Sequence, residues 1–193
     1  MNLSNKITIS RILIMPFFMM SLDYSGVFWK VIAMLLFAYA CYSDWLDGSL
    51  ARKHSWVTDF GKFLDPLADK IFVCAAFIAF VGDNIFDIPA WIVTLIIFRE
   101  FMITGLRTLA VSKNIVLSAQ AIGKYKTVIQ LFTIGAIILI SLLYELEKAG
   151  ALVINKWFYT LFGYTPIVLM AITAIVTVLS GLHYLWENRR LFR

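Results

Sequence analysis

Apolar residues fill six long runs of this 193-residue chain, and short polar or charged segments separate the runs. A helix that crosses a bilayer needs about 20 mostly apolar residues. The pattern therefore predicts an all-α, polytopic membrane protein, with six transmembrane helices packed as one bundle that makes residues 1–193 a single domain. The expected spans lie at about 7–22, 30–50, 66–82, 88–108, 119–144 and 164–186.

The first run is the weakest candidate for a span. Its uninterrupted apolar part, from Ile12 to Met20, is short, and Lys6 and Arg11 precede it, which is also the pattern of a signal peptide. No small-residue cleavage site follows, because the chain continues with Ser, Leu and Asp from position 21. We therefore expect a retained first span.

Composition supports a membrane protein. Hydrophobic residues make up 61% of the chain and charged residues 15%, whereas soluble domains have roughly 45–50% and about 25%. Cys41 and Cys74 lie inside apolar runs without the spacing of metal ligands, which indicates packing roles. The net charge of +5 comes from residues at the ends of apolar runs rather than from one basic face, which argues against nucleic-acid binding.

The positions of Lys and Arg predict the orientation in the membrane. With six spans and both termini in the cytoplasm, 14 of the 17 Lys and Arg residues fall on the cytoplasmic side. Only Lys30, Lys148 and Lys156 fall on the opposite side. We therefore expect both termini to be cytoplasmic.

Four aspartates lie at the expected cytoplasmic ends of the second and third spans. Asp44 and Asp47 are three residues apart, and Asp65 and Asp69 are four apart, so each pair shares one face of its helix. A connection of about ten residues would make these helices antiparallel neighbours whose acidic faces meet in one pocket. Four carboxylates suit Mg²⁺, Mn²⁺ or Ca²⁺ rather than zinc.

Other roles are open to the polar residues of this segment. Capping explains Asp59, but one helix end uses one cap, so capping does not explain four further aspartates. An ion pathway also places carboxylates in membranes, although it would scatter them through the bilayer rather than at one surface. Gly48, Ala51 and Gly61 serve either close helix packing or room for a nucleotide. Arg52 serves either as an anchor or as a partner of a phosphate.

The segment as a whole reads Asp44-x2-Asp47-Gly48-x2-Ala51-Arg52-x8-Gly61-x3-Asp65-x3-Asp69. It resembles the signature of the CDP-alcohol phosphotransferase family at all eight fixed positions, which makes the motif specific. The resemblance covers residues 5–127. Three further segments are similar to those of family members that use glycerol 3-phosphate: GKFLDPLADK (61–70), REFMITGLR (99–107) and GKYKT (123–127). The segment NKITISR (5–11) resembles an N-terminal pattern common in the family.

The resemblance implies a multi-pass enzyme of the bacterial cytoplasmic membrane, usually a homodimer, whose site faces the cytoplasm. It would transfer the phosphatidyl group of CDP-diacylglycerol to sn-glycerol 3-phosphate with the help of two divalent cations, Mg²⁺ or Mn²⁺. Asp69 would be the general base and would also contact a cation. The other metal ligands would be Asp44, Asp47 and Asp65, and the CDP-binding residues would be Gly48, Ala51, Arg52 and Gly61.

The phosphate of the acceptor is a dianion that needs a basic pocket, for which Arg99, Arg107, Lys124 and Lys126 are the candidates. On an ideal helix, Arg99 and Arg107 lie about 80° apart and can reach one cavity. Lys124 and Lys126 lie about 200° apart, so we expect only one of them to point inward. The alternative for all four is anchoring at the ends of spans. Glu100 is expected to pair with Arg99.

Asn5, Thr8 and Arg11 recur every third residue, which holds them on one side of a helix. We hypothesise that they close the pocket from below. Two alternative functions stay open: the same chemistry with inositol phosphate, serine or phosphatidylglycerol as acceptor, and an ion-binding channel or transporter. The basic residues of the fourth and fifth spans argue against serine, whereas inositol phosphate also fits them.

Overall fold

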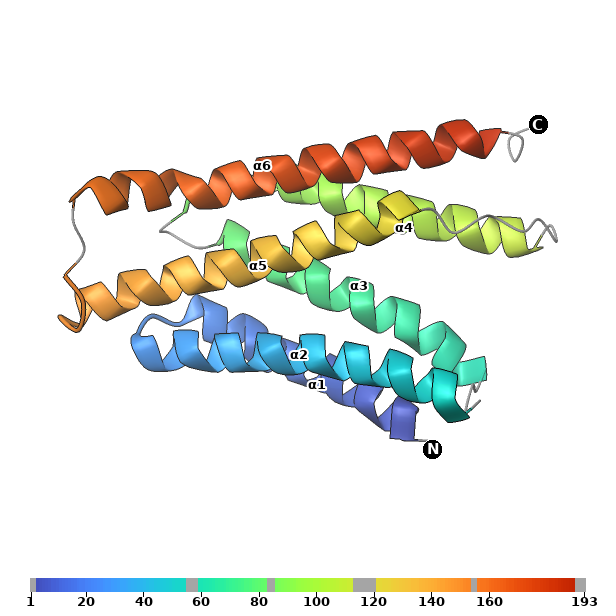
Figure 1. Ribbon diagram of the computed structural model, residues 1–193, viewed down its shortest axis with the longest axis horizontal. Coiled ribbons are helices and arrows are strands. Elements are labelled where there is room, and N and C mark those ends of the chain that lie inside the picture. The colour runs from blue at the N-terminus through green and yellow to red at the C-terminus, as the bar shows by residue number, and fades with distance from the viewer. Residues whose placement is uncertain (1–2, 55–58, 83–85, 113–120, 154–155, 190–193) are drawn as a thin grey trace.

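The computed structural model describes the backbone of residues 3–54, 59–82, 86–112, 121–153 and 156–189. Side chains are described for residues 7–46, 68, 70–82, 86–110, 125–153 and 162–189. These parts of the chain form six α-helices, as the apolar runs predict (Figure 1). Their bounds are α1 Leu3–Asp23, α2 Val27–His54, α3 Asp59–Val81, α4 Ala90–Ser112, α5 Ala121–Lys148 and α6 Lys156–Glu187.

Each predicted span falls on one helix, but α3 and α6 begin seven and eight residues before their predicted starts, and α2, α4 and α5 end four residues beyond their predicted ends. α2 continues to His54 and α3 begins at Asp59, so the motif positions lie within helices on both sides of their connection. α2 has 28 residues, which gives a length of about 42 Å. The hydrocarbon core of a bilayer is about 30 Å thick. α2 therefore extends beyond its apolar run.

Three segments of the described helices are long and apolar enough to cross a membrane: Val27–Leu46, Tyr125–Lys148 and Phe162–Glu187. α3 contributes a shorter apolar segment, and α4 carries Arg99, Glu100 and Arg107 within its length. The chain is therefore a membrane protein with several apolar helices.

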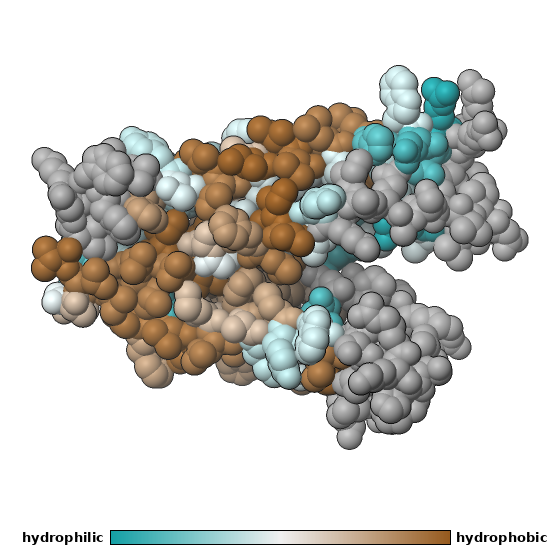
Figure 2. All heavy atoms as spheres, viewed as in Figure 1, coloured by the Kyte–Doolittle hydropathy of each residue, from teal (hydrophilic) through white to brown (hydrophobic). Residues whose placement is uncertain are grey.

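Every one of the six helices exposes a large apolar side chain. Figure 2 shows apolar residues across the middle of the bundle and hydrophilic residues toward the end at which α6 ends. Soluble monomers rarely expose contiguous apolar patches of this kind. Examples in chain order are Phe17, Leu35, Ile78, Phe98, Phe132 and Leu179.

The helices pack as one bundle in which α1 lies against both α2 and α3, while α6 lies against α4 and α5. α5 also contacts α2 and α3, and it thereby joins the two groups. The ring of Phe18 in α1 stacks on Phe72 in α3, with 4.9 Å between ring centroids. The hydroxyl groups of Thr133 in α5 and Thr173 in α6 lie 2.8 Å apart, a hydrogen bond typical of membrane helix interfaces.

One end of the bundle collects the starts of α1, α3 and α5 and the ends of α2, α4 and α6 (Figure 1). We call it the motif end, because α2 and α3 carry the aspartate motif there. At the opposite end, Lys30 is buried and its Nζ donates a hydrogen bond to the carbonyl oxygen of Leu22. The first helix begins and the last helix ends on the same side of the bundle, as the predicted topology requires.

Candidate active site

The four motif aspartates lie on the two helices that meet at the motif end. Asp47 lies seven residues before the end of α2, and Asp65 lies six residues after the start of α3. At 1.5 Å per residue, both backbone positions are about 10 Å from their helix ends. The two positions are therefore at similar depths from the connection between the helices.

Among the motif residues, the side chain of Asp44 is described. Among the described residues, no three His, Cys, Asp or Glu side chains gather in a way that could hold a metal ion. Three of the four predicted ligands, Asp47, Asp65 and Asp69, have side chains outside the described residues, so the four-carboxylate site stays a prediction. The motif residues whose side chains lie outside the described residues are Asp47, Gly48, Ala51, Arg52, Gly61, Asp65 and Asp69.

Asp44 is held by an arginine of the first helix. Nη1 of Arg11 donates a hydrogen bond to Oδ1 of Asp44 over 2.9 Å, and the two side chains form an ion pair. The Arg11 side chain is 4% exposed, whereas that of Asp44 is 56% exposed. α1 packs against both α2 and α3, so its polar face lies beside the motif.

The other two residues that were predicted to close the pocket with Arg11 are Thr8 and Asn5. Thr8, one turn before Arg11, is fully buried. The side chain of Asn5 lies outside the described part of the chain. Arg11 therefore contacts the motif through Asp44, and its role in closing the pocket stays a prediction.

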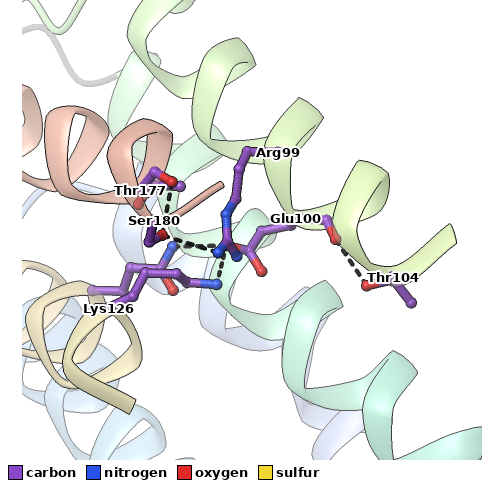
Figure 3. A network of polar contacts seen from close by, with 7 residues as sticks. Arg99, Glu100, Thr104, Lys126, Thr177 and Ser180 are labelled. Atoms are coloured by element: carbon purple, nitrogen blue, oxygen red, sulfur yellow. Dashed lines mark hydrogen bonds and ion pairs between the residues drawn. The ribbon is translucent and has the colours of Figure 1, made fainter. Parts of the chain in front are cut away.

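A second polar cluster joins α4, α5 and α6 (Figure 3). Nζ of Lys126 forms an ion pair with Oε1 of Glu100, and Nε2 of Gln130 donates a hydrogen bond to the same oxygen over 3.1 Å. Nη1 of Arg99 lies 3.8 Å from that oxygen, and its Nη2 donates to Oγ of Ser180 over 2.9 Å. All five residues are buried. We call them the buried network.

Burial makes the pairing of these charges necessary, because an isolated buried charge is costly. The predicted ion pair of Glu100 with Arg99 is present, and Glu100 contacts Lys126 and Gln130 more closely still. Its carboxylate therefore lies between two cations, one from α4 and one from α5.

The inner face of α6 positions the Arg99 side chain. The hydroxyl of Ser180 donates to the carbonyl oxygen of Thr177, which leaves its oxygen to accept the hydrogen bond from Arg99. A Cβ atom at Gly181 would lie 2.9 Å from Cγ of Arg99, closer than real Cβ contacts come. Any other residue at position 181 would force the Arg99 side chain to shift.

The structure brings two of the four predicted basic residues into the network. Lys126 is buried there, and the side chain of Lys124 lies outside the described residues. Arg107 is exposed, and its Cζ lies 5.9 Å from the ring centroid of Tyr184 on α6. Arg99 and Arg107 thus contact neighbouring turns of the same helix.

From the sequence we did not identify four residues that lie around the basic side chains of α4 and α5. Gln130 follows Lys126 by one helical turn, a spacing that places both on one face and was available as a signal. Ser180, Gly181 and Tyr184 are ordinary residues of a membrane helix, and nothing in their pattern distinguishes them from packing residues.

The chain is similar over nearly its whole length to proteins of known family. A model described as CDP-alcohol phosphatidyltransferase matches residues 1–179. The CDP-diacylglycerol–glycerol-3-phosphate 3-phosphatidyltransferase of Bacillus subtilis is 38% identical over 97% of this chain and 95% of that protein. A probable phosphatidylglycerophosphate synthase of Mycobacterium tuberculosis is 36% identical over 95% of this chain and 79% of its own.

A third relative, from Rickettsia felis, has the same name as the Bacillus protein and is 30% identical over 99% of this chain and 97% of its own length. The resemblance read from the motif is thereby confirmed across residues on both sides of it. The chain belongs to the CDP-alcohol phosphatidyltransferase family.

Proposed function

We propose that this protein transfers the phosphatidyl group of CDP-diacylglycerol to sn-glycerol 3-phosphate, giving phosphatidylglycerophosphate and CMP. The observation that carries the proposal is the agreement of relatives that cover nearly the whole chain and whose names state this reaction. The complete aspartate motif and the basic residues of α4 and α5 support it, since they supply the two kinds of site that the reaction needs.

All six helices would span a bacterial cytoplasmic membrane, with both termini and the motif end on the cytoplasmic side. Exposed apolar side chains on every helix support this arrangement, as do the positions of 14 of the 17 Lys and Arg residues. A site at the cytoplasmic surface of the membrane suits a lipid donor and a water-soluble acceptor. Homodimerisation stays a prediction, because exposed apolar faces suit lipid and a second copy equally well.

Two divalent cations, Mg²⁺ or Mn²⁺, would be held by Asp44, Asp47, Asp65 and Asp69. The fit rests on the donor set, because carboxylate oxygens are the ligands these cations prefer. Asp44 is more than half exposed, so a cation can reach its carboxylate. When bound, the cations would supply positive charge to the pyrophosphate of the donor and to the departing CMP. Arg11 orients Asp44 from the side of α1.

Asp69 would accept the proton of the acceptor hydroxyl while that oxygen attacks the phosphorus of the phosphatidyl group. The bond between this phosphorus and the oxygen of CMP breaks, and CMP leaves with the electron pair. Gly48, Ala51 and Gly61 would leave room for the nucleotide, and Arg52 would pair with its phosphate.

The acceptor phosphate would bind beside the buried network. Arg99, Arg107 and Lys126 bring three positive charges and Glu100 brings one negative charge, so an excess of two remains. A phosphate monoester dianion balances that excess, whereas serine has no net charge. Lys124 stays a fourth candidate.

An acceptor series tests the proposal. Purified protein in detergent, with CDP-diacylglycerol and Mg²⁺ or Mn²⁺, is expected to release CMP with sn-glycerol 3-phosphate and not with serine or phosphatidylglycerol. Release with inositol phosphate alone would contradict the acceptor assignment. Absence of metal-dependent CMP with every acceptor would contradict the enzyme activity and return attention to an ion-binding role.

A further inference from the structure

Two buried hydrogen-bond donors at the contact between α4 and α6 have no partner among the described residues. The hydroxyl of Tyr184 and Nε of Arg99 are inaccessible to solvent and have no hydrogen-bond partner within the part of the chain that is described. Tyr184 is 4% exposed and Arg99 is 8% exposed. Leaving a buried donor unpaired is costly, and such groups are uncommon in native proteins.

Both donors belong to residues at the contact between α4 and α6. A Cβ atom at Gly181 would lie 3.3 Å from Nε of Arg99, which places that nitrogen against α6. Tyr184 follows Gly181 by three residues, so it lies on the same face one turn nearer the motif end. Arg107 covers the Tyr184 ring. The Tyr184 ring therefore lies beside the Arg107 guanidinium, one turn of α6 beyond the residues that Arg99 contacts.

The chemistry of this group of residues indicates an oxyanion. Arg99, Arg107 and the Tyr184 hydroxyl all donate hydrogen bonds, and guanidinium groups bind phosphate well. The nearest described carboxylate of the network, Glu100, is already bonded to Lys126 and Gln130. A phosphate with several acceptor oxygens would satisfy both unused donors at once.

We infer that Tyr184 is a specificity-determining residue whose hydroxyl donates a hydrogen bond to the phosphate of the acceptor, in a subsite completed by Nε of Arg99 and by Arg107. This inference rests on the proposed function and adds to it a residue from α6. The hydroxyl binds a group that does not react, so it contributes to acceptor affinity rather than to the chemical step.

Tyr184→Phe removes only this hydroxyl. In steady-state assays of CMP release, KM for sn-glycerol 3-phosphate is expected to rise about ten- to a hundredfold, the range for losing a hydrogen bond to a charged group. We expect kcat to stay within about twofold and KM for CDP-diacylglycerol to stay unchanged. Tyr164→Phe, the same change at an exposed position of α6, is the matched control and should leave all three values unchanged.

Thermal unfolding gives a second measurement that a purely structural tyrosine would not match. Without ligand, the Tm of Tyr184→Phe should equal or exceed that of the wild type, because the lost hydroxyl has no partner among the side chains that the structure describes. The increase in Tm that inorganic phosphate causes in the wild type should shrink in the variant. A lower Tm without phosphate, together with an unchanged increase, would overturn the inference.

The two proposals fail in different ways. If the wild type uses sn-glycerol 3-phosphate but Tyr184→Phe has an unchanged KM for it, the role of Tyr184 is wrong and the function stands. If the wild type releases no CMP with this acceptor, the function is wrong. Loss of the phosphate-induced increase in Tm in the variant would still support the oxyanion subsite.

Discussion

Asp69→Asn will lower kcat by at least about 100-fold, while CDP-diacylglycerol continues to bind. Asparagine has nearly the shape of aspartate but cannot take up the proton of the acceptor hydroxyl, and general base catalysis contributes about 10²- to 10⁴-fold. Three motif carboxylates remain for the cations in this variant. Turnover is measured as CMP release at saturating acceptor, and donor binding is measured separately by equilibrium titration with CDP-diacylglycerol.

Asp59→Asn is the matched control, since it makes the same change at the first residue of the same helix, where we expect a cap. Its kcat should stay close to the wild-type value. Near-normal turnover of Asp69→Asn would remove Asp69 from the role of base. Loss of donor binding in that variant would instead show that Asp69 acts chiefly through the cations.

Lys126→Met will destabilise the protein by about 3–5 kcal/mol, the loss expected when one partner of a buried ion pair is removed. Methionine fills much of the volume of lysine, so the effect comes from the charge. The Glu100 carboxylate would keep Gln130 at 3.1 Å and Arg99 at 3.8 Å but lose its nearest cation. The free energy of unfolding in detergent micelles, measured by denaturant titration, checks the prediction.

The double variant Glu100→Gln/Lys126→Met separates charge from packing. Removing both charges leaves no unpaired anion, but Arg99 loses its contact with Glu100 and keeps its hydrogen bond to Ser180, so we expect the double variant to recover part of the loss. Lys148→Met, at an exposed lysine in the last turn of α5, should change stability by less than about 0.5 kcal/mol. A double variant as unstable as Lys126→Met would show that the network contributes through shape alone.

Hydropathy predicts the six helices well and their ends poorly. An apolar run reports the part of a helix that must avoid water, and the runs coincide with α1 to α6. The ends of α2 and α3 carry polar motif residues, so hydropathy places about 15 residues between the spans where the structure has helix up to His54 and again from Asp59. Polar residues at a membrane surface are as helical as apolar ones when their neighbours continue the helix.

The sequence predicts which site residues lie on the same face of one helix. Lys126 is buried, whereas the side chain of Lys124 lies outside the described residues, so the angular argument that only one of the two points inward stays a prediction. Contacts between helices, such as Arg11 with Asp44 or Arg99 with Ser180, depend on packing that no single segment encodes. A lone Tyr184 in an apolar helix is indistinguishable from a packing residue until the structure shows its hydroxyl buried and without a partner in the described part of the chain.

Titration of the purified protein with Mn²⁺, followed by electron paramagnetic resonance, tests most directly whether the motif carboxylates of α2 and α3 gather around paired cations. The spectrum counts bound ions and shows magnetic coupling when two lie within about 4 Å, the spacing of two-metal sites. We expect two coupled Mn²⁺ ions per chain, and loss of the coupling in Asp47→Asn/Asp65→Asn. Absence of tight Mn²⁺ binding, or an unchanged coupled spectrum in that variant, would contradict the account.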